Sequence, residues 1–202
     1  MIKLSILTPV YNQEALVIRA LDSIPRRDDI EIIVCDDGSS DRTLEKLKEY
    51  AKGLNMTVLF NKKNKGVAAT ANKLLAAAKG EYFHFLMSDD RLDTLNYSGL
   101  IDRLYDIDVD ILAMDLQINS GEIWVLNEKT DRLWCAQACR FIRREVVKGI
   151  KYPENVKVGE DAYFHEDMMA RKPSVEYSGV VAYLYNFPRE GSLLNLSSRG
   201  LI

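Results

Sequence analysis

Two pairs of adjacent aspartates, Asp36–Asp37 and Asp89–Asp90, have the side chains in this sequence that are best suited to chemistry. Each pair directly follows an apolar segment typical of a buried strand. Two neighbouring carboxylates in such a place disfavour each other's charge unless a cation offsets it. Mg²⁺ sites commonly combine one or two carboxylates with substrate phosphates. Asp89 and Asp90 are therefore candidate ligands of a metal that bridges a diphosphate.

Each acidic segment also has a purely structural interpretation. Asp90 could cap a following helix while Asp89 is solvated, and the residues alone support both readings equally. In the segment DDGSSD, a turn and an N-cap at Asp41 explain the later residues but not the first two aspartates together. A third pair, Glu160–Asp161, follows a glycine at an expected helix start, where acidic side chains are favoured for structural reasons.

The first ninety residues alternate between strand-like and helix-like periods, which predicts a β-α-β-α-β-α-β run. The strand segments are almost continuously apolar, as in parallel sheets that helices cover on both faces. We expect an open, doubly wound, mostly parallel α/β sheet, with both aspartate pairs on the rim where ligands bind. The expected strands are Lys3–Thr8, Ile30–Cys35, Met56–Phe60 and Tyr82–Met87, and the expected helices are Glu14–Ile24, Thr43–Lys52 and Val67–Ala78.

After residue 90 the alternation breaks. No linker and no internal repeat separates the two parts, so we predict one domain over residues 1–202, with a nucleotide-binding half (1–92) and an accessory acceptor-binding half (93–202). The expected helices are Leu95–Tyr105 and Glu160–Ala170, and the expected strands lie near Asp110–Gln117, Glu122–Leu126, Ser174–Tyr177 and Val180–Asn186.

Composition excludes several classes of protein. The chain has 202 residues, 47% of them hydrophobic, which suffices for one core. Its 27 basic and 30 acidic residues give a net charge of -3, so nothing overall favours nucleic acid as a partner. No apolar segment approaches the roughly 20 residues of a membrane span, and no signal-peptide cleavage region is visible. Three cysteines without CxxC spacing favour a reduced, cytoplasmic setting and structural thiols over zinc.

Five segments of the chain resemble, in order and approximate spacing, the motifs of glycosyltransferase family 2. These enzymes have the GT-A fold and pass a sugar from a nucleotide-sugar to an acceptor hydroxyl. By contrast, the chain has neither a Walker-type loop nor an early GxGxxG. The segments are SILTPVYNQEALVIRALDSI, IIVCDDGSSDRT, NKGVAATANKLLAAAKGEYFHFLMSDD, ACRFIRREVV and GEDAYF.

The resemblance implies a role for particular residues. Thr8 and Asp37 would line the nucleoside pocket, with Asp37 reading the base edge. Asp89 and Asp90 would serve the ribose-diphosphate and a divalent cation, Mn²⁺ or Mg²⁺. Asp161 would be the general base of an inverting transfer.

The segment YLYNFPREGS resembles the closing segment of the family and would place Arg189 and Ser192 on a loop over the diphosphate. The implied donor is a nucleotide-sugar, most plausibly UDP-linked, and the implied acceptor is a glycan or a lipid-linked saccharide. Two departures stand out. Ala71 replaces the Arg that commonly precedes the Asn of the third helix, and Met87 replaces an Asp that often begins the metal motif.

Two other function classes remain open at this point. A degenerate transferase domain could act as a nucleotide-binding or assembly module, which Ala71 and Met87 favour and the retained Asp89, Asp90 and Asp161 oppose. A sugar nucleotidyltransferase shares the layered layout, but the chain shows no early Gly-rich segment with a basic residue for a triphosphate.

Several single residues have competing interpretations. His84 lies in an apolar strand and is expected in the core, while His165 is expected to be solvated or hydrogen-bonded on a helix. Trp124 could pack or stack on a sugar, and we favour Trp134 as an acceptor platform. The basic stretch of residues 140–151 is expected to be a solvated helix face, with peripheral contact to the inner face of a membrane as the alternative. Its basic residues are Arg140, Arg143, Arg144, Lys148 and Lys151.

Overall fold

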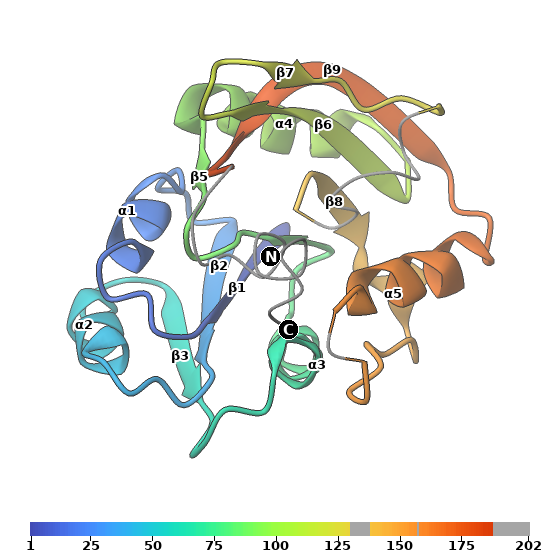
Figure 1. Ribbon diagram of the computed structural model, residues 1–202. Coiled ribbons are helices and arrows are strands. Elements are labelled where there is room, and N and C mark those ends of the chain that lie inside the picture. Colours follow the sequence, from blue (N-terminus) through green and yellow to red (C-terminus); the bar gives the residue numbers. More distant parts are fainter. Residues whose placement is uncertain (130–137, 157, 188–202) are drawn as a thin grey trace.

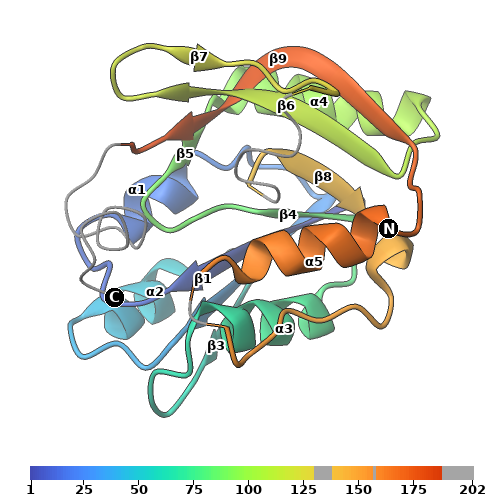
Figure 2. The same cartoon turned by 45° about the vertical axis from the view of Figure 1, so that its right-hand side comes forward.

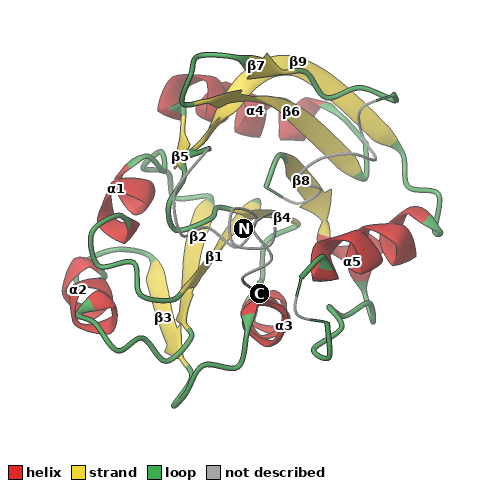
Figure 3. Ribbon diagram, viewed as in Figure 1, coloured by secondary structure: helices red, strands yellow, loops and turns green. Residues whose placement is uncertain are grey.

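The computed structural model describes residues 1–129, 138–156 and 158–187. Within these residues, the strands form one curled sheet in the order β3-β2-β1-β4-β8-β6-β9-β5, and the short β7 pairs with β6 (Figure 1). Helices cover both faces of this sheet (Figure 3). The predicted α/β class with an accessory second half is therefore confirmed.

The first half of the chain is the predicted alternating run. All its strands are parallel, and β1 lies between β2 and β4. The strands are β1 (Leu4–Val10), β2 (Ile30–Asp36), β3 (Met56–Phe60) and β4 (Tyr82–Phe85), and the helices are α1 (Val17–Asp22), α2 (Thr43–Tyr50) and α3 (Val67–Ala77). Their apolar periods explain these elements, because strands buried on both faces need apolar side chains at nearly every position.

The second half extends the same sheet. The strand β8 pairs antiparallel with both β4 and β6, so it joins the two halves through main-chain hydrogen bonds. The strand β6 pairs parallel with β9, and β9 pairs antiparallel with β5 at the edge. The elements are β5 (Arg91–Leu92), α4 (Thr94–Asp106), β6 (Ile111–Ile118), β7 (Ile123–Trp124), β8 (Arg140–Arg143), the 3₁₀ helix η1 (Arg144–Val147), α5 (Glu160–Met169) and β9 (Val175–Tyr185).

Two apolar clusters fill the space on the two faces of the sheet. One packs α1, α2 and α4 against side chains such as Ile6 and Val34, and the other packs α3 and α5 against side chains such as Leu7 and Ile33. In Figure 2, α3 and α5 run side by side on their face of the sheet. The alternation of neighbouring strand residues between the two faces follows from the two-residue period of a strand.

Two expectations about the second half were wrong. The basic stretch does not form a solvated helix face, because its first part is the strand β8 and the guanidinium-bearing Arg140 is only 1% exposed. The two expected strands at the carboxyl end are one continuous strand, β9. Its Gly179 has φ = 65° and lies where the register with β6 shifts, so this glycine marks an irregularity within the strand rather than its end.

No helix in the described ranges combines the length and the apolar character needed to cross a bilayer.

Candidate active site

The turns that carry the two aspartate pairs lie on either side of the carboxyl end of β1, at one edge of the sheet. The main-chain N–H of Asp37 donates to the carbonyl of Val10, at 2.8 Å, and the N–H of Leu86 donates to the carbonyl of Leu7, at 3.0 Å. The turns after β2 and β4 therefore flank the end of β1 on its two sides. The rim at this edge of the sheet is acidic, and ligands of open α/β sheets bind at such edges.

Two buried oxygen atoms near this rim have no hydrogen-bond partner among the described residues: Thr8 Oγ1 and Asp36 Oδ1. Thr8 is fully buried and Asp36 is 1% exposed. The other oxygen of Asp36 accepts a 3.1 Å hydrogen bond from the N–H of Ser39. A buried polar atom without a partner costs free energy, so these atoms are positions where a ligand would be stabilised. The prediction included Thr8 but not Asp36, although the paired aspartates offered the signal.

Asp37 organises the loop that follows β3. Its Oδ1 accepts from Asn61 Nδ2 at 2.8 Å and from the N–H of Lys65 at 3.0 Å, and its Oδ2 accepts from the N–H of Gly66 at 2.8 Å. The side chain is 4% exposed. A carboxylate can accept about four hydrogen bonds, so Oδ2 retains capacity for one more. Reading of a base edge by Asp37 stays a prediction that this remaining capacity permits.

The turn between Asp37 and this loop depends on Gly38. Its φ is 73°, in the left-handed region, and a Cβ built there would lie 2.6 Å from the carbonyl carbon of Lys63. Only glycine allows both the conformation and the close approach of the two loops. The glycine of the DDGS segment thus serves to bring the loop of residues 61–66 against Asp37.

Asp90 anchors the carboxyl end of β9. Its Oδ2 accepts a 2.6 Å hydrogen bond from the hydroxyl of Tyr183, and its Oδ1 accepts a 2.8 Å hydrogen bond from the N–H of Asn186. The alternative role of Asp90 as a helix cap is wrong, because Asp93 caps α4 through a 3.0 Å hydrogen bond from the N–H of Asn96. Asp89 is half-buried, and Arg19 Nη2 donates to its carbonyl oxygen at 2.8 Å.

The chemistry of Asp89 and Asp90 fits a hard divalent cation. Both supply carboxylate oxygens, and each oxygen of Asp90 can accept more than the one hydrogen bond described above. In residues 1–129, 138–156 and 158–187, no three His, Cys, Asp or Glu side chains gather into a complete metal site. A cation here would thus take its remaining ligands from substrate phosphates and water, as Mg²⁺ commonly does.

Asp161 is the second residue of α5 and is half-buried. The N-cap position of α5 is Gly159, with φ = 83°, and no side chain forms a capping hydrogen bond there. Asp161 Oδ1 accepts a 3.0 Å hydrogen bond from the N–H of Ala162. Burial, together with the charge of Asp161, raises the pKa of the neighbouring Glu160. Asp161 is therefore not the N-cap residue of α5, although its carboxylate accepts from a first-turn N–H, and its role as a general base stays a prediction.

Tyr152 is a residue of this region that the motifs did not indicate. Its hydroxyl is buried and has no hydrogen-bond partner among the described residues. Burial raises its pKa well above the usual value, and the charges of Asp161 and Glu160 raise it further. The Tyr152 ring stacks on Phe164 of α5, with the ring centroids 4.2 Å apart. No motif could reveal it, because its importance comes from contacts with residues distant in sequence.

The departure at Ala71 has a structural reason. Ala71 is 3% exposed and belongs to the apolar cluster between α3 and the sheet, where a guanidinium would be buried. The next residue, Asn72, forms two hydrogen bonds with the main chain of Tyr152, at 2.8 and 3.0 Å. The face of α3 at this position thus holds the segment before α5 instead of offering a cation to a ligand. Met87 is half-buried and forms part of the same apolar cluster.

The other predicted residues fall into three groups. Arg189, Ser192, Trp134 and Cys135 lie outside the described residues. His84 is fully buried with its ring nitrogens next to Tyr97 and Ala138, which confirms its place in the core. Trp124 packs near the rings of Tyr185 and Phe187, and Cys35 and Cys139 are buried.

The basic stretch is largely engaged within the protein. Arg143 donates to Asp108 and to the hydroxyl of Tyr82, both at 2.8 Å, and Lys148 pairs with Glu145 at 2.9 Å. Arg144 donates to the carbonyl of Gly80, at 2.9 Å. These contacts position β8 and η1, while Arg144, Lys148 and Lys151 are exposed, and peripheral membrane contact of this stretch stays a prediction.

A parallel β-α-β run, acidic turns after β2 and β4, and an antiparallel strand that joins an accessory half define the fold of a GT-A glycosyltransferase. The chain belongs to the family described as "Glycosyl transferase family 2", whose profile matches residues 5–159. The resemblance of the sequence motifs to this family is thereby confirmed.

Relatives and solved structures support this assignment. The chain is 26% identical to the minor teichoic acid biosynthesis protein GgaB of Bacillus subtilis over 209 residues, which cover 93% of the chain but 23% of GgaB. It is 30% identical to an uncharacterized glycosyltransferase of Haemophilus influenzae, over 87% of the chain and 75% of that protein. The crystal structure of S. aureus TarS in complex with UDP-GlcNAc superposes with a TM-score of 0.83 at 24% identity, over 98% of this chain and 61% of that one.

Proposed function

We propose that this chain is an inverting glycosyltransferase that moves a sugar from a UDP-linked donor to a hydroxyl of a glycan or lipid-linked saccharide. The observation that carries the proposal is the pair of unpartnered buried oxygens, Thr8 Oγ1 and Asp36 Oδ1, beside the aspartates that follow β2 and β4. Atoms of this kind are stabilised by a polar ligand such as a nucleoside. The S. aureus TarS structures, which include complexes with UDP and UDP-GlcNAc, share the fold and support the choice of donor.

The nucleoside end of the donor would be bound by Thr8 and Asp37. Asp37 Oδ2 has capacity for a further hydrogen bond, which a base N–H can donate. Because the carboxylate also holds the loop of residues 61–66, its position is fixed before the donor arrives. A carboxylate that is already held in place loses little conformational entropy when the donor binds, so it favours both affinity and specificity.

The diphosphate end would lie beside Asp89 and Asp90, which would hold a divalent cation, Mn²⁺ or Mg²⁺. When bound, such a cation neutralises the charge that builds up on the departing diphosphate. Asp90 also connects this turn to β9 through Tyr183 and Asn186, so the carboxylates are positioned by the second half of the sheet. Arg189, which lies outside the described residues, would add a further cationic contact to the diphosphate.

Asp161 would accept the proton of the acceptor hydroxyl as its oxygen attacks the anomeric carbon from the side opposite the diphosphate. Direct displacement from that side inverts the configuration. Proton transfer by a positioned carboxylate is typically worth about 10²- to 10⁴-fold in rate. The position of Asp161 at the start of α5, beside Glu160 and close enough to Tyr152 to affect its pKa, supports this role.

The proposal is tested with a panel of nucleoside diphosphates and their sugars. UDP should raise the melting temperature of the chain more than ADP, GDP or CDP do, since a ligand that binds only the folded state stabilises it. UDP-sugars should then be consumed in the presence of saccharide acceptors, with formation of UDP. If no nucleotide raises the melting temperature, the proposal fails. If UDP binds but no UDP-sugar is turned over with any acceptor, the chain is a nucleotide-binding module instead.

A further inference from the structure

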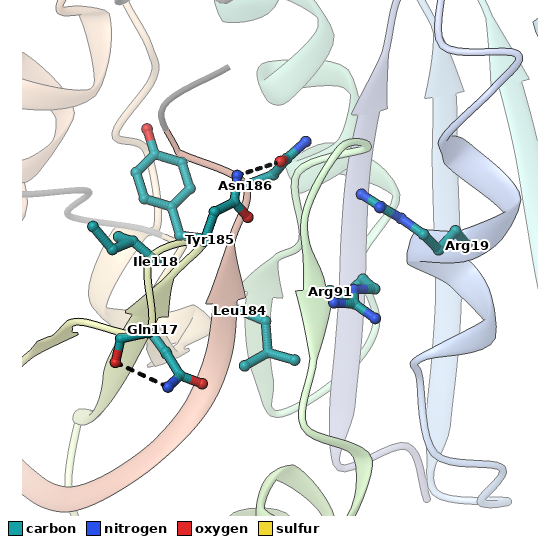
Figure 4. Close-up of a pocket in the computed structure, with 9 residues that line it drawn as sticks. Arg19, Arg91, Gln117, Ile118, Leu184, Tyr185 and Asn186 are labelled. Atoms are coloured by element: carbon teal, nitrogen blue, oxygen red, sulfur yellow. Dashed lines mark hydrogen bonds between the residues drawn. The ribbon is translucent and has the colours of Figure 1, made fainter.

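A polar cavity of about 250 Å³ lies beside the turn of residues 88–90, and two of its lining residues, Arg19 and Asn186, also contact the aspartates of the candidate active site (Figure 4). It opens between α1, β5 and the carboxyl ends of β6 and β9. Its charged and amide lining side chains are Arg19, Arg91, Gln117, Asn119 and Asn186, and none of the described residues that line it is an Asp or Glu. Figure 4 shows the two arginines on one side of the cavity and the strand ends that carry Gln117 and Asn186 on the other.

Neither arginine is neutralised by a carboxylate in the described part of the chain. The side chain of Arg91 forms no hydrogen bond or ion pair with the described residues, and the guanidinium of Arg19 donates among them only to the carbonyl oxygen of Asp89. By contrast, Arg27 lies 2.8 Å from Asp29, and Arg143 lies 2.8 Å from Asp108. Two uncompensated cations beside one cavity favour an anionic ligand, and a guanidinium suits an oxyanion because its N–H groups form a rigid fork.

The amides that line the cavity can add neutral donors. Asn119 Nδ2 donates to Asn186 Oδ1 at 2.9 Å, and Gln117 Nε2 donates to the carbonyl of Gly121 at 3.1 Å. Each of these amide groups carries two N–H donors, so each keeps one beyond the hydrogen bond that orients it. A tetrahedral oxyanion, which has several acceptor oxygens, matches this combination of two guanidiniums and two amides better than a planar carboxylate does.

The cavity shares a wall with the proposed metal site. Arg19 is bound to the carbonyl of Asp89, and the main-chain N–H of Asn186 is bound to the carboxylate of Asp90, both at 2.8 Å. An anion in the cavity therefore lies on the far side of the turn that carries both aspartates. Its charge would be compensated by arginines, while a diphosphate at the aspartates would be compensated by a cation.

We propose that this cavity is a subsite for a phosphate group. The class of ligand, an oxyanion, follows from the two arginines and the amides of the cavity. The molecule that carries the phosphate rests on the proposed function, since a transferase brings together a donor and an acceptor that can both carry phosphate. The phosphate would belong either to the diphosphate of the donor or to a phosphate-bearing acceptor. Arg91 and Arg19 supply the charge-assisted hydrogen bonds, and Gln117 and Asn119 complete the set of donors.

The test compares the affinities of Arg91→Gln and of the parent for inorganic phosphate, measured by calorimetry at low ionic strength. Arg91 is the appropriate position because its side chain has no partner among the described residues, so its loss should not disturb the fold. Phosphate should bind at least about tenfold more weakly to Arg91→Gln. Arg91→Lys, which keeps the charge but loses the fork, should give an intermediate affinity.

The matched control is Arg42→Gln. It removes the same charge from α2, where the side chain is 69% exposed and pairs only with Glu45. This variant should bind phosphate as the parent does. If Arg42→Gln weakens phosphate binding as much as Arg91→Gln does, or if the parent does not bind phosphate, the proposal is overturned. Equal melting temperatures of all variants would establish that folding is not the cause.

A second set of titrations identifies the source of the phosphate. If the cavity binds the donor diphosphate, Arg91→Gln should lower the affinity for UDP by the same factor as the affinity for phosphate. The affinity for uridine should be unchanged. If it binds an acceptor phosphate, UDP affinity should be unchanged, and phosphate should still bind to the complex with UDP. If UDP fails to bind the parent while phosphate binds in a manner that depends on Arg91, the proposed transferase function fails and the subsite stands.

Discussion

The hydroxyl of Tyr183 donates a 2.6 Å hydrogen bond to Oδ2 of Asp90, although 93 positions separate the two residues in the sequence. Both side chains are buried, at 1% exposure each. The contact fixes the last described strand, β9, to the turn that carries the proposed metal ligands. Asp90 thus has a structural role that does not depend on any ligand, and its side chain is more deeply buried than that of Asp89, which is half-buried.

Replacement of Asp90 by alanine should therefore destabilise the protein even without nucleotide or metal. The change leaves the hydroxyl of Tyr183 and the N–H of Asn186 without their acceptor, so the free energy of unfolding should fall by about 3 kcal/mol. Asp89→Ala should cost about 1 kcal/mol or less. Urea denaturation of both variants measures the difference. Equal losses of stability would contradict the distinct structural role of Asp90.

Divalent cations should strengthen the stabilisation by UDP. Asp89 and Asp90 present two negative charges toward a diphosphate, and these repel it unless a cation lies between them. Mn²⁺ or Mg²⁺ should therefore increase the shift of the melting temperature that UDP causes, and the effect should disappear with excess chelator. Uridine, which has no phosphate, is the control and should show no dependence on metal. An equal shift by UDP after exhaustive chelation would count against metal bridging.

Asp37→Ala should weaken the binding of uridine in the absence of metal, by about tenfold. The carboxylate is proposed to accept a hydrogen bond from the base, and it also holds the loop of residues 61–66. Calorimetry with uridine measures the first effect. Proteolysis of the free protein near residues 61–66 reports the second, because loss of three hydrogen bonds should expose this loop. The assignment fails if Asp37→Ala binds uridine as the parent does.

Asp161→Asn should abolish transfer and leave the fold intact. The amide has no basic site at neutral pH, so the rate should fall by about 10²- to 10⁴-fold, while UDP affinity stays near that of the parent. The melting temperature should change little, because Asn can also accept the hydrogen bond from the N–H of Ala162. Glu160 lies beside Asp161 and could replace it in part.

The double variant Glu160→Gln with Asp161→Asn is therefore the stricter test of the base. Both acidic groups near Tyr152 are then neutral, and no carboxylate remains in the first turn of α5. Activity assayed with the correct acceptor should be lost entirely at neutral pH. Full activity in this double variant would falsify the assignment of a general base to this helix.

The buried His84 should make the protein less stable as the pH falls. Burial lowers its pKa from 6.5 to about 4. Between these two pKa values, the unfolded chain binds a proton at His84 that the folded chain does not bind. The stability that neutral His84 contributes is therefore complete above pH 6.5 and is lost as the pH falls toward about 4. At about pH 5 the loss relative to pH 7 should be about 2 kcal/mol.

Urea denaturation at both pH values checks this, with His84→Gln as the comparison. The variant has no imidazole to protonate at this position, so its loss of stability between the two pH values should be smaller than that of the parent by the same amount. An identical pH dependence in the two proteins would show that His84 is not the group responsible.

The pattern of apolar residues along the chain was enough to predict the first half of the fold. The periods of apolar residues predicted every strand and helix from β1 to β4, since such periods report which face of an element is buried and depend only on neighbouring residues. The aspartates at the ends of β2 and β4 then had to meet, because parallel strands place their carboxyl ends at the same edge. The burial of His84 followed from its apolar neighbours in the same way.

The contacts that these residues make could not be predicted in the same way, because they depend on the folded chain. The strand β8 lies between β4 and β6, and its two arginines hid it from a reading of local hydrophobicity. The bond of Asp90 to Tyr183 and the meeting of Arg19 with Arg91 at one cavity both join residues that are far apart in the chain. Local periodicity carries no information about such contacts. They arise when distant strands pair and exclude water between them, which is a property of the whole fold.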